Sequence, residues 1–224
     1  MVQRRELKLD IERIGTVSAI LTQPDHARAC YVLAHGAGAD MRHSFMEEVA
    51  ERLATRGIAT FRFNFPYMEK KLGRPDQPAA AHAAIRAAVA EAARLCPGLK
   101  LVAGGKSFGG RMTSQAQSKS ALPGVRGLAF LGFPLHAAKK PSSERAGHLA
   151  GIAIPMLFLQ GTRDELADLG LLTPVIAQLG AKATLHQVEG GDHSFAVLKK
   201  SGRTNDEALT EVLDTLAAWI DKLS

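Results

Sequence analysis

Short apolar runs alternate along the chain with longer segments whose apolar residues recur at helical spacing. The short runs have the length of buried strands, and most of them end in glycine, proline or a polar loop. Two of the longer segments begin at the favourable N-cap residues Ser44 and Asn205. The pattern predicts strands near residues 6–12, 16–24, 29–36, 58–65, 99–105, 127–133, 155–161 and 183–189, and helices near 44–57, 79–95, 107–120, 167–179 and 205–223.

Strands that alternate with helices are typical of an α/β fold, in which a mainly parallel sheet is covered by helices on both faces. The first two runs, 6–12 and 16–24, instead alternate with period two around Gly15 and predict a hairpin. The longest irregular stretch between late strands, 133–153, has room for a short helix only. We therefore expect one domain over residues 1–224, without a lid domain.

Composition excludes several classes of function. The chain is 46% hydrophobic and 22% charged, as in an ordinary folded protein. No apolar run reaches the roughly 18 residues of a membrane span, and the basic start lacks the apolar stretch of a secretion signal. The net charge of +6 comes from scattered residues with few aromatics between them. We expect a cytoplasmic protein with no membrane and no nucleic-acid partner.

The segment LVAGGKSFGG, residues 101–110, raises three alternatives for a strand-to-helix turn. A phosphate loop would need a glycine five positions before Gly105, where Lys100 stands. A dinucleotide fingerprint in HGAGADM has only two of its three glycines. The nucleophile elbow G-x-S-x-G fits, with Ser107 two positions from Gly105 and from Gly109. An idle serine in a glycine-rich turn stays open at this point.

A nucleophilic serine needs a base, and the base needs an orienting carboxylate. In folds with a nucleophile elbow, the chain order is serine, then acid, then histidine, and each residue follows a strand. Asp164 follows the strand 155–161, and we prefer it to its neighbours Glu165 and Asp168. His193 lies in a glycine-rich loop after the last strand. Together they support a triad with Ser107.

A tetrahedral intermediate needs backbone N–H donors. We expect one from Phe108, which follows the nucleophile at the start of a helix, and one from Ala37 in the loop HGAGAD. His35 and Asp40 are expected to hold that loop. No group of His, Cys or Asp residues has metal-ligand spacing, so neither a metal nor an organic cofactor is expected.

With HGAGAD, GGKSFGGRM, QGTRDEL and GGDHSF, the chain resembles the alpha/beta hydrolase family over essentially its whole length. Within the family it looks most like the small, lidless branch related to dienelactone hydrolase. FRFNFPYMEKKLGRPD and GFPLH are similar to bacterial relatives of the testis-expressed and NSL-complex-subunit hydrolase-like proteins. The resemblance implies an eight-stranded sheet with an antiparallel second strand, and carries the triad onto Ser107, Asp164 and His193.

The sequence thus predicts a serine hydrolase that cleaves small ester or related acyl bonds through an acyl-enzyme. The alternative is a non-catalytic interaction module that keeps the fold, because some relatives in this branch are subunits of complexes. The oligomeric state stays open between a monomer and a small homo-oligomer. Loops after the strands supply the candidate substrate contacts, which are Arg62, Asn64, Tyr67, His136 and Arg111.

Overall fold

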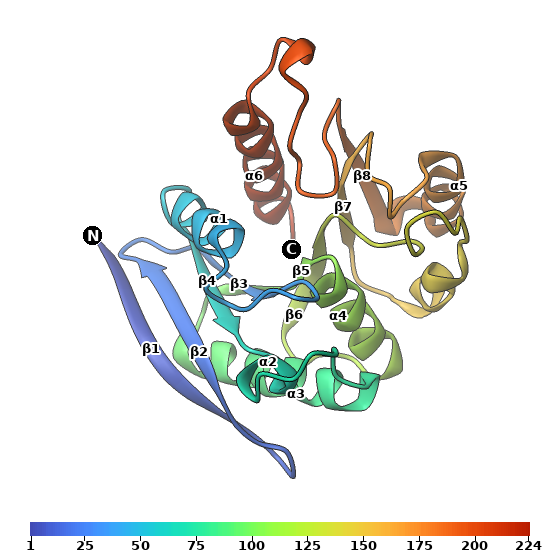
Figure 1. Ribbon diagram of the computed structural model, residues 1–224. Helices are drawn as coiled ribbons and strands as arrows, with labels where there is room; N and C mark the ends of the chain where they lie inside the picture. The colour runs from blue at the N-terminus through green and yellow to red at the C-terminus, as the bar shows by residue number, and fades with distance from the viewer.

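The computed structural model describes residues 1–224 and is built on an eight-stranded sheet with the strand order β1-β2-β4-β3-β5-β6-β7-β8 (Figure 1). Strands β3 to β8 are parallel to one another, and β2 is antiparallel to both of its neighbours. The predicted α/β fold with an antiparallel second strand is confirmed. The strands are β1 (Val2–Ile11), β2 (Gly15–Pro24), β3 (Ala29–Ala34), β4 (Ile58–Phe63), β5 (Lys100–Lys106), β6 (Val125–Leu131), β7 (Met156–Gly161) and β8 (Ala183–Val188).

Helices cover both faces of the sheet and enclose two separate apolar cores (Figure 1). One core lies under α1 (Ser44–Ala54) and α6 (Asn205–Asp221). The other lies under α3 (Pro78–Leu95), α4 (Phe108–Lys119) and α5 (Leu169–Leu179). Each helix is amphipathic and buries one stripe of its surface, so the sheet must be apolar on both faces.

Strand β3 shows how one short run of sequence serves both cores. All six of its residues are buried. Cys30 and Val32 belong to the core on the α3–α4 side, whereas Tyr31 and Leu33 belong to the core on the α1–α6 side. Successive side chains of a strand point to opposite faces, so a continuous apolar run is what a central strand of a covered parallel sheet requires.

The parallel strands deliver their following loops to one edge of the sheet, which is where polar side chains gather. The connection between β6 and β7, which includes residues 133–153, holds a single short 3₁₀-helix and no lid. No helix of the structure has both the length and the apolar character that crossing a membrane requires. The short helices are α2 (Pro66–Glu69), η1 (Glu144–Gly151), η2 (Gly180–Lys182) and η3 (Lys199–Ser201).

The N-cap residues of two helices differ from the sequence-based expectation by one position, whereas the helices themselves begin at Ser44 and Asn205 as predicted. The N-cap of α1 is His43, whose Nδ1 accepts a hydrogen bond from the Phe45 N–H at 3.3 Å. The N-cap of α6 is Thr204, which forms a reciprocal capping box with Glu207. The predictions of Ser44 and Asn205 as N-caps were wrong, because a cap is decided by which side chain reaches the free N–H groups of the first turn.

Candidate active site

Ser107 stands at a sharp turn between the last residue of β5, Lys106, and the first residue of α4, Phe108. Its backbone has φ 50° and ψ −116°, a conformation that L-residues rarely adopt. Gly105 and Gly109 make the turn possible. A Cβ on Gly105 would lie 2.1 Å, and one on Gly109 2.4 Å, from the Ala34 carbonyl oxygen at the end of β3. Both small residues therefore let the turn approach the neighbouring strand.

The histidine and the acid that were predicted from the sequence are hydrogen-bonded to one another. Asp164 follows β7, His193 follows β8, and His193 Nδ1 lies 2.7 Å from Asp164 Oδ2. The carboxylate is buried and also accepts hydrogen bonds from the Leu166 N–H at 2.8 Å and from the Gln160 side chain. An ionised carboxylate only accepts hydrogen bonds, so at this distance Nδ1 of the neutral imidazole carries the proton and donates it as a hydrogen bond to Asp164. The proton-accepting nitrogen of the ring is then Nε2.

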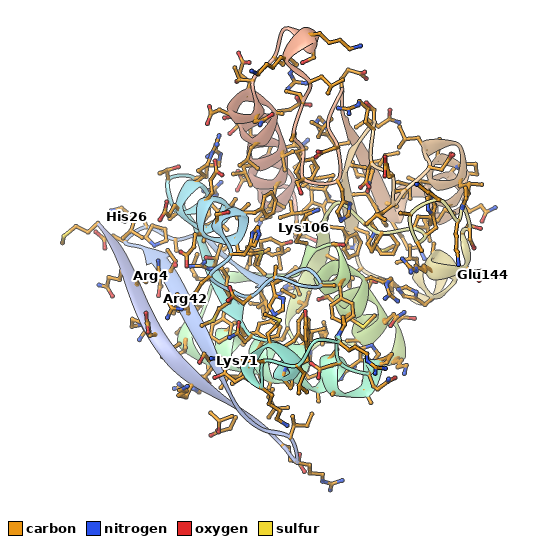
Figure 2. The ribbon with its side chains drawn as sticks, viewed as in Figure 1. Arg4, His26, Arg42, Lys71, Lys106 and Glu144 are labelled. Carbon is orange, nitrogen blue, oxygen red and sulfur yellow. The ribbon has the colours of Figure 1, made fainter.

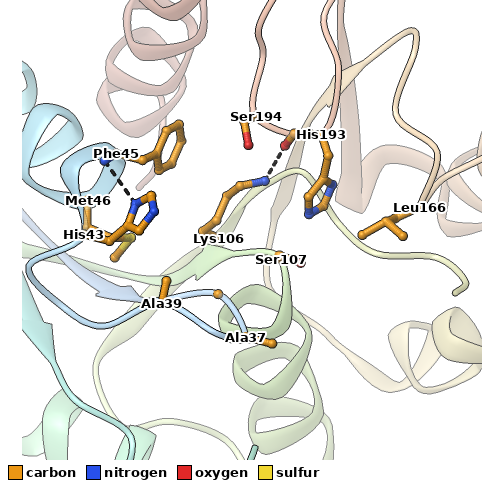
Figure 3. Close-up of a pocket in the computed structure, with 11 residues that line it drawn as sticks. Ala37, Ala39, His43, Phe45, Met46, Lys106, Ser107, Leu166, His193 and Ser194 are labelled. Atoms are coloured by element: carbon orange, nitrogen blue, oxygen red, sulfur yellow. Dashed lines mark hydrogen bonds between the residues drawn. The ribbon is translucent and has the colours of Figure 1, made fainter. Parts of the chain in front are cut away.

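Nε2 of His193 is buried and has no hydrogen-bond partner. Ser107 and His193 line the same pocket, and the imidazole ring lies on the side of the pocket above Ser107 (Figure 3). No hydrogen bond joins the Ser107 hydroxyl to Nε2. Contacts of this kind are often long in a free enzyme and shorten in the complex with substrate. Leaving a buried polar nitrogen without a hydrogen bond costs free energy, so such an atom calls for an explanation. A role in accepting the proton of the nearby Ser107 hydroxyl would explain it.

Lys106 connects the nucleophile turn to the histidine loop, a role that sequence reasoning missed. Its side chain is buried, and Nζ donates a hydrogen bond to the His193 carbonyl oxygen (Figure 3). Nζ also lies 5.7 Å from the ring centre of Phe45 and 5.8 Å from that of Phe195, within the range of cation–π attraction. Burial lowers the pKa of Lys106 to about 8, against the attraction of Asp164.

The loop after β3 places a backbone N–H near the nucleophile. A Cβ on Gly36 would lie 3.6 Å from the Ser107 Cβ, so this loop passes directly beside the serine. The next N–H, of Ala37, makes no hydrogen bond within the chain. The N–H of Phe108 belongs to the first residue of α4, where a helix has no internal acceptor. The N–H groups of Ala37 and Phe108 thus have no acceptor within the chain, and both belong to segments next to Ser107.

His35 holds this loop in place. Its Nε2 accepts a hydrogen bond from the Phe65 N–H at 3.1 Å, and its Nδ1 therefore donates to the Gly36 carbonyl at 2.8 Å. Burial lowers the pKa of His35 to about 4, so the ring is neutral near pH 7. Asp40 accepts from the Arg42 N–H at 2.8 Å. Both residues serve the loop structure.

The pocket around Ser107 has a volume of about 330 Å³ and is open at one side. Its walls are mainly apolar, and the charged group that reaches it is Lys106. No group of three or more His, Cys, Asp or Glu side chains is placed to hold a metal ion. The lining residues are Gly36, Ala37, Ala39, His43, Phe45, Met46, Lys106, Ser107, Leu166, His193 and Ser194 (Figure 3).

Two of the predicted substrate contacts lie outside this pocket and are bonded within the fold. Arg62 is buried, donates to the Met41 carbonyl at 2.9 Å and pairs with Glu47 at 3.1 Å. Asn64 accepts from the Met41 N–H at 3.0 Å and donates to Glu69 at 2.9 Å. Arg62 holds the end of β4 against α1 and the loop after β3, and Asn64 holds the loop after β4 in place.

The other three predicted contacts also do not line the pocket. The Tyr67 hydroxyl accepts from the Gly38 N–H at 3.3 Å, and His136 Nε2 accepts from the Asp168 N–H at 2.9 Å. Arg111 lies over the ring of Phe108 at 5.9 Å and makes no hydrogen bond through its side chain. Substrate binding by these residues stays a prediction, and for Arg111 the structure leaves the guanidinium available.

The two carboxylates that compete with Asp164 in the sequence lie elsewhere. Asp168 is the N-cap of α5, and its side chain accepts from the Gly170 and Leu171 N–H groups at 2.7 and 3.3 Å. It therefore precedes the helix, whereas we expected it within the helix on an exposed face. Glu165 is exposed and makes no ion pair. Only Asp164 reaches the histidine.

The fold, together with the placement of Ser107, Asp164 and His193, indicates the class of protein. Residues 27–221 match the family model described as the alpha/beta hydrolase domain. The match spans most of the chain, and the chain belongs to the alpha/beta hydrolase family.

Several solved structures of hydrolases and esterases share the fold of this chain. A dienelactone hydrolase from Anabaena variabilis is 19% identical, with a TM-score of 0.77 over 99% of this chain and 98% of that one. A lidless alpha/beta serine hydrolase from Xanthomonas campestris is 19% identical, with a TM-score of 0.74 over 97% and 95%. A cold-adapted esterase from an Arctic intertidal metagenomic library is 22% identical, with a TM-score of 0.67 over 100% and 95%. At these identities the likeness concerns the fold, and the expected dienelactone-hydrolase-like branch is confirmed at that level. The further similarity to the testis-expressed and NSL-complex-subunit proteins stays a prediction.

Proposed function

We propose that this chain is a serine hydrolase that cleaves small ester or related acyl bonds through a triad of Ser107, His193 and Asp164. Membership of the alpha/beta hydrolase family supports a hydrolase. The main support for the triad is the His193–Asp164 hydrogen bond of 2.7 Å. The opposite ring nitrogen of His193 has no partner and lies in the same pocket as Ser107. A carboxylate that fixes the Nδ1–H tautomer leaves Nε2 as the base for the serine.

In the first half-reaction, the Ser107 oxygen attacks the carbonyl carbon of the substrate while Nε2 of His193 takes the hydroxyl proton. The negative charge that develops on the carbonyl oxygen is stabilised by the N–H groups of Ala37 and Phe108. Asp164 stays ionised and stabilises the imidazolium. Collapse of the intermediate breaks the bond to the alcohol, which leaves with the proton from Nε2.

In the second half-reaction, water attacks the acyl group on Ser107. Nε2 of His193 takes one proton from this water as its oxygen bonds to the acyl carbon. Collapse of the second tetrahedral intermediate breaks the bond to Ser107, and the proton returns to the serine oxygen. The acid product leaves, and the free enzyme is restored.

A fluorophosphonate probe tests the nucleophile, because only an activated serine reacts with it quickly. The wild-type protein is expected to be labelled at one residue, Ser107, and Ser107→Ala is expected to remain unlabelled. Peptide mapping by mass spectrometry locates the adduct. Stoichiometric labelling of Ser107→Ala would overturn the assignment. An unlabelled wild-type protein would overturn the enzyme in favour of a non-catalytic interaction module.

The size of the pocket predicts which acyl chains are preferred. A volume of about 330 Å³ without a lid cannot bury a long chain, and burial contributes about 0.8 kcal/mol per CH₂ group. With p-nitrophenyl esters, kcat/KM is expected to peak at acyl chains of about two to six carbons. A steady rise to twelve carbons would contradict an open, short cleft.

A further inference from the structure

Two partly buried arginines lack the acceptors that the other buried arginines have. Seven arginine side chains are partly or fully buried. Five of them donate hydrogen bonds to carboxylates, hydroxyls or main-chain carbonyls, whereas Arg111 and Arg145 make no side-chain hydrogen bond and no ion pair. A buried guanidinium without an acceptor is unfavourable, and Nε of Arg111 is fully buried without a partner. The five bonded arginines are Arg52, Arg56, Arg62, Arg86 and Arg203.

Local helix geometry brings these two arginines to one place. Arg111 and Ser114 are three residues apart on α4, and Arg145 and His148 are three residues apart on η1. Residues at this spacing lie on one face of a helix. The two faces are joined by a hydrogen bond of 2.7 Å between Ser114 Oγ and His148 Nε2. Arg111 and Arg145 therefore each lie one helical turn from the contact that packs η1 on α4.

The charges at this junction are of one sign. Burial lowers the pKa of Arg111, and the positive charge of Arg145 lowers it further. Burial also lowers the pKa of His148 to about 4, so His148 is neutral near pH 7. The nearest acid in sequence, Glu144, is exposed at the outer edge of the molecule and makes no ion pair (Figure 2). An anion is what would balance this pair.

The pair lies close to the nucleophile. Ser107 is the N-cap of α4 and Arg111 follows it by four residues, so both lie on the same face of the helix, about 6 Å apart along its axis. The Arg111 guanidinium rests on the ring of Phe108, at 5.9 Å. We propose that Arg111 and Arg145 form an anion-binding subsite that receives a carboxylate or phosphate group of the substrate, one helical turn from the reacting carbonyl.

This inference rests on the proposed function, and a matched pair of esters tests it. Ethyl hexanoate and monoethyl adipate have acyl chains of equal length and differ in the terminal carboxylate. Wild-type kcat/KM is expected to be higher for monoethyl adipate, and the adipate-to-hexanoate ratio is expected to fall at least about tenfold in Arg145→Gln and in Arg111→Gln. Arg126→Gln is the control. Arg126 is exposed and unpaired, and it lies near the start of β6, at the edge of the sheet away from Ser107.

The outcomes separate this inference from the proposed function. A wild-type ratio at or below one, or an equal ratio in Arg145→Gln and Arg126→Gln, overturns the subsite while hydrolysis by Ser107 stands. Hydrolysis of neither ester by a protein that a fluorophosphonate also leaves unlabelled overturns the proposed function itself.

Inorganic phosphate probes the subsite without catalysis. At constant ionic strength, phosphate is expected to raise the melting temperature of wild-type protein and of Ser107→Ala, and to have a smaller effect on Arg145→Gln. The same melting shift in all three proteins would overturn anion binding at this pair. Phosphate is also expected to inhibit monoethyl adipate hydrolysis competitively. Purely non-competitive inhibition would overturn a substrate subsite and indicate a separate anion site.

Discussion

The loops after β7 and β8 and the loop after β4 leave the same edge of the sheet, yet they use their polar side chains differently. At the end of β4, Arg62 and Asn64 are engaged with Glu47, Glu69 and the backbone of Met41, and only Nε of Arg62 lacks a partner. After β7 and β8, Asp164 orients His193, but the outer nitrogen of His193 has no partner.

This difference teaches which polar groups at a strand end are available for chemistry. A side chain whose donors and acceptors are already matched has little free energy left to offer a ligand, because binding must first break those bonds. A buried group without a hydrogen-bond partner can bind a ligand without first breaking a bond. Both terminal nitrogens of Arg62 are bonded, so we interpret the end of β4 as support and the loops after β7 and β8 as the proposed reacting side.

Asp164→Asn should produce the largest effect on the reacting side. The amide favours the wrong imidazole tautomer, so turnover is expected to fall on the order of 10³–10⁴-fold with the fold retained. Steady-state kinetics with a short p-nitrophenyl ester, paired with thermal melts, measure it. Glu165→Gln and Asp168→Asn are the controls, each with a change of less than about tenfold, or ~1.4 kcal/mol. Full activity in Asp164→Asn would contradict the assignment of Asp164 as the residue that orients His193.

Arg62→Gln should affect stability, because it removes one half of a buried ion pair between β4 and α1. Arg62 is 1% exposed and Glu47 is 21% exposed, and breaking such a pair costs about 3 kcal/mol of unfolding free energy. Urea unfolding measures this loss. Arg42→Gln breaks the exposed pair with Glu6 and is expected to cost at most about 1 kcal/mol. Equal losses in the two variants would contradict a structural role for Arg62.

His35 joins the loop after β3 to the loop after β4 and makes stability depend on pH. Its pKa in the folded protein is about 4, below the value near 6.5 of an unfolded chain, so the unfolded state binds more protons between these values. Stability from this residue is therefore full above about pH 6.5 and declines as the pH falls, by about 2 kcal/mol at pH 5. Urea unfolding at pH 7 and pH 5 measures the decline.

The control for this pH dependence is a second histidine. His35→Gln is expected to reduce the decline between pH 7 and pH 5, whereas His26→Gln, at an exposed position, is expected to leave it unchanged (Figure 2). An identical decline in wild type and His35→Gln would show that another group governs acid stability. His148, whose pKa is also lowered to about 4, would then be the next residue to change.

Lys106→Met should give the smallest of these effects. Loss of the hydrogen bond from Nζ to the His193 carbonyl loosens the histidine loop, and kcat is expected to fall about tenfold with a smaller change in KM. The rate of fluorophosphonate labelling should fall in parallel. Lys100→Met is the matched control, because Lys100 lies on the same strand and donates to main-chain carbonyls at the opposite end. Equal kcat losses would mean that the effect comes from the strand.

Local sequence was sufficient for the elements and for the nucleophile turn. Apolar runs, their spacing and the G-x-S-x-G pattern depend on residues a few positions apart, and the strands, the hairpin and the strained Ser107 followed from them. The N-caps His43 and Thr204 were missed by one residue, because neighbouring side chains compete for the same free N–H groups.

The chain by itself therefore determined an α/β sheet with Ser107 at a strand end and Asp164 and His193 after later strands. Only the tertiary structure decided which polar side chains are matched and which are free. Lys106 and His193 are 87 residues apart, and Asp164 and His193 are 29 apart. Contacts at such separations depend on strand order and on the direction of each side chain. Neither is encoded in a local pattern, because each is set by how the whole sheet packs.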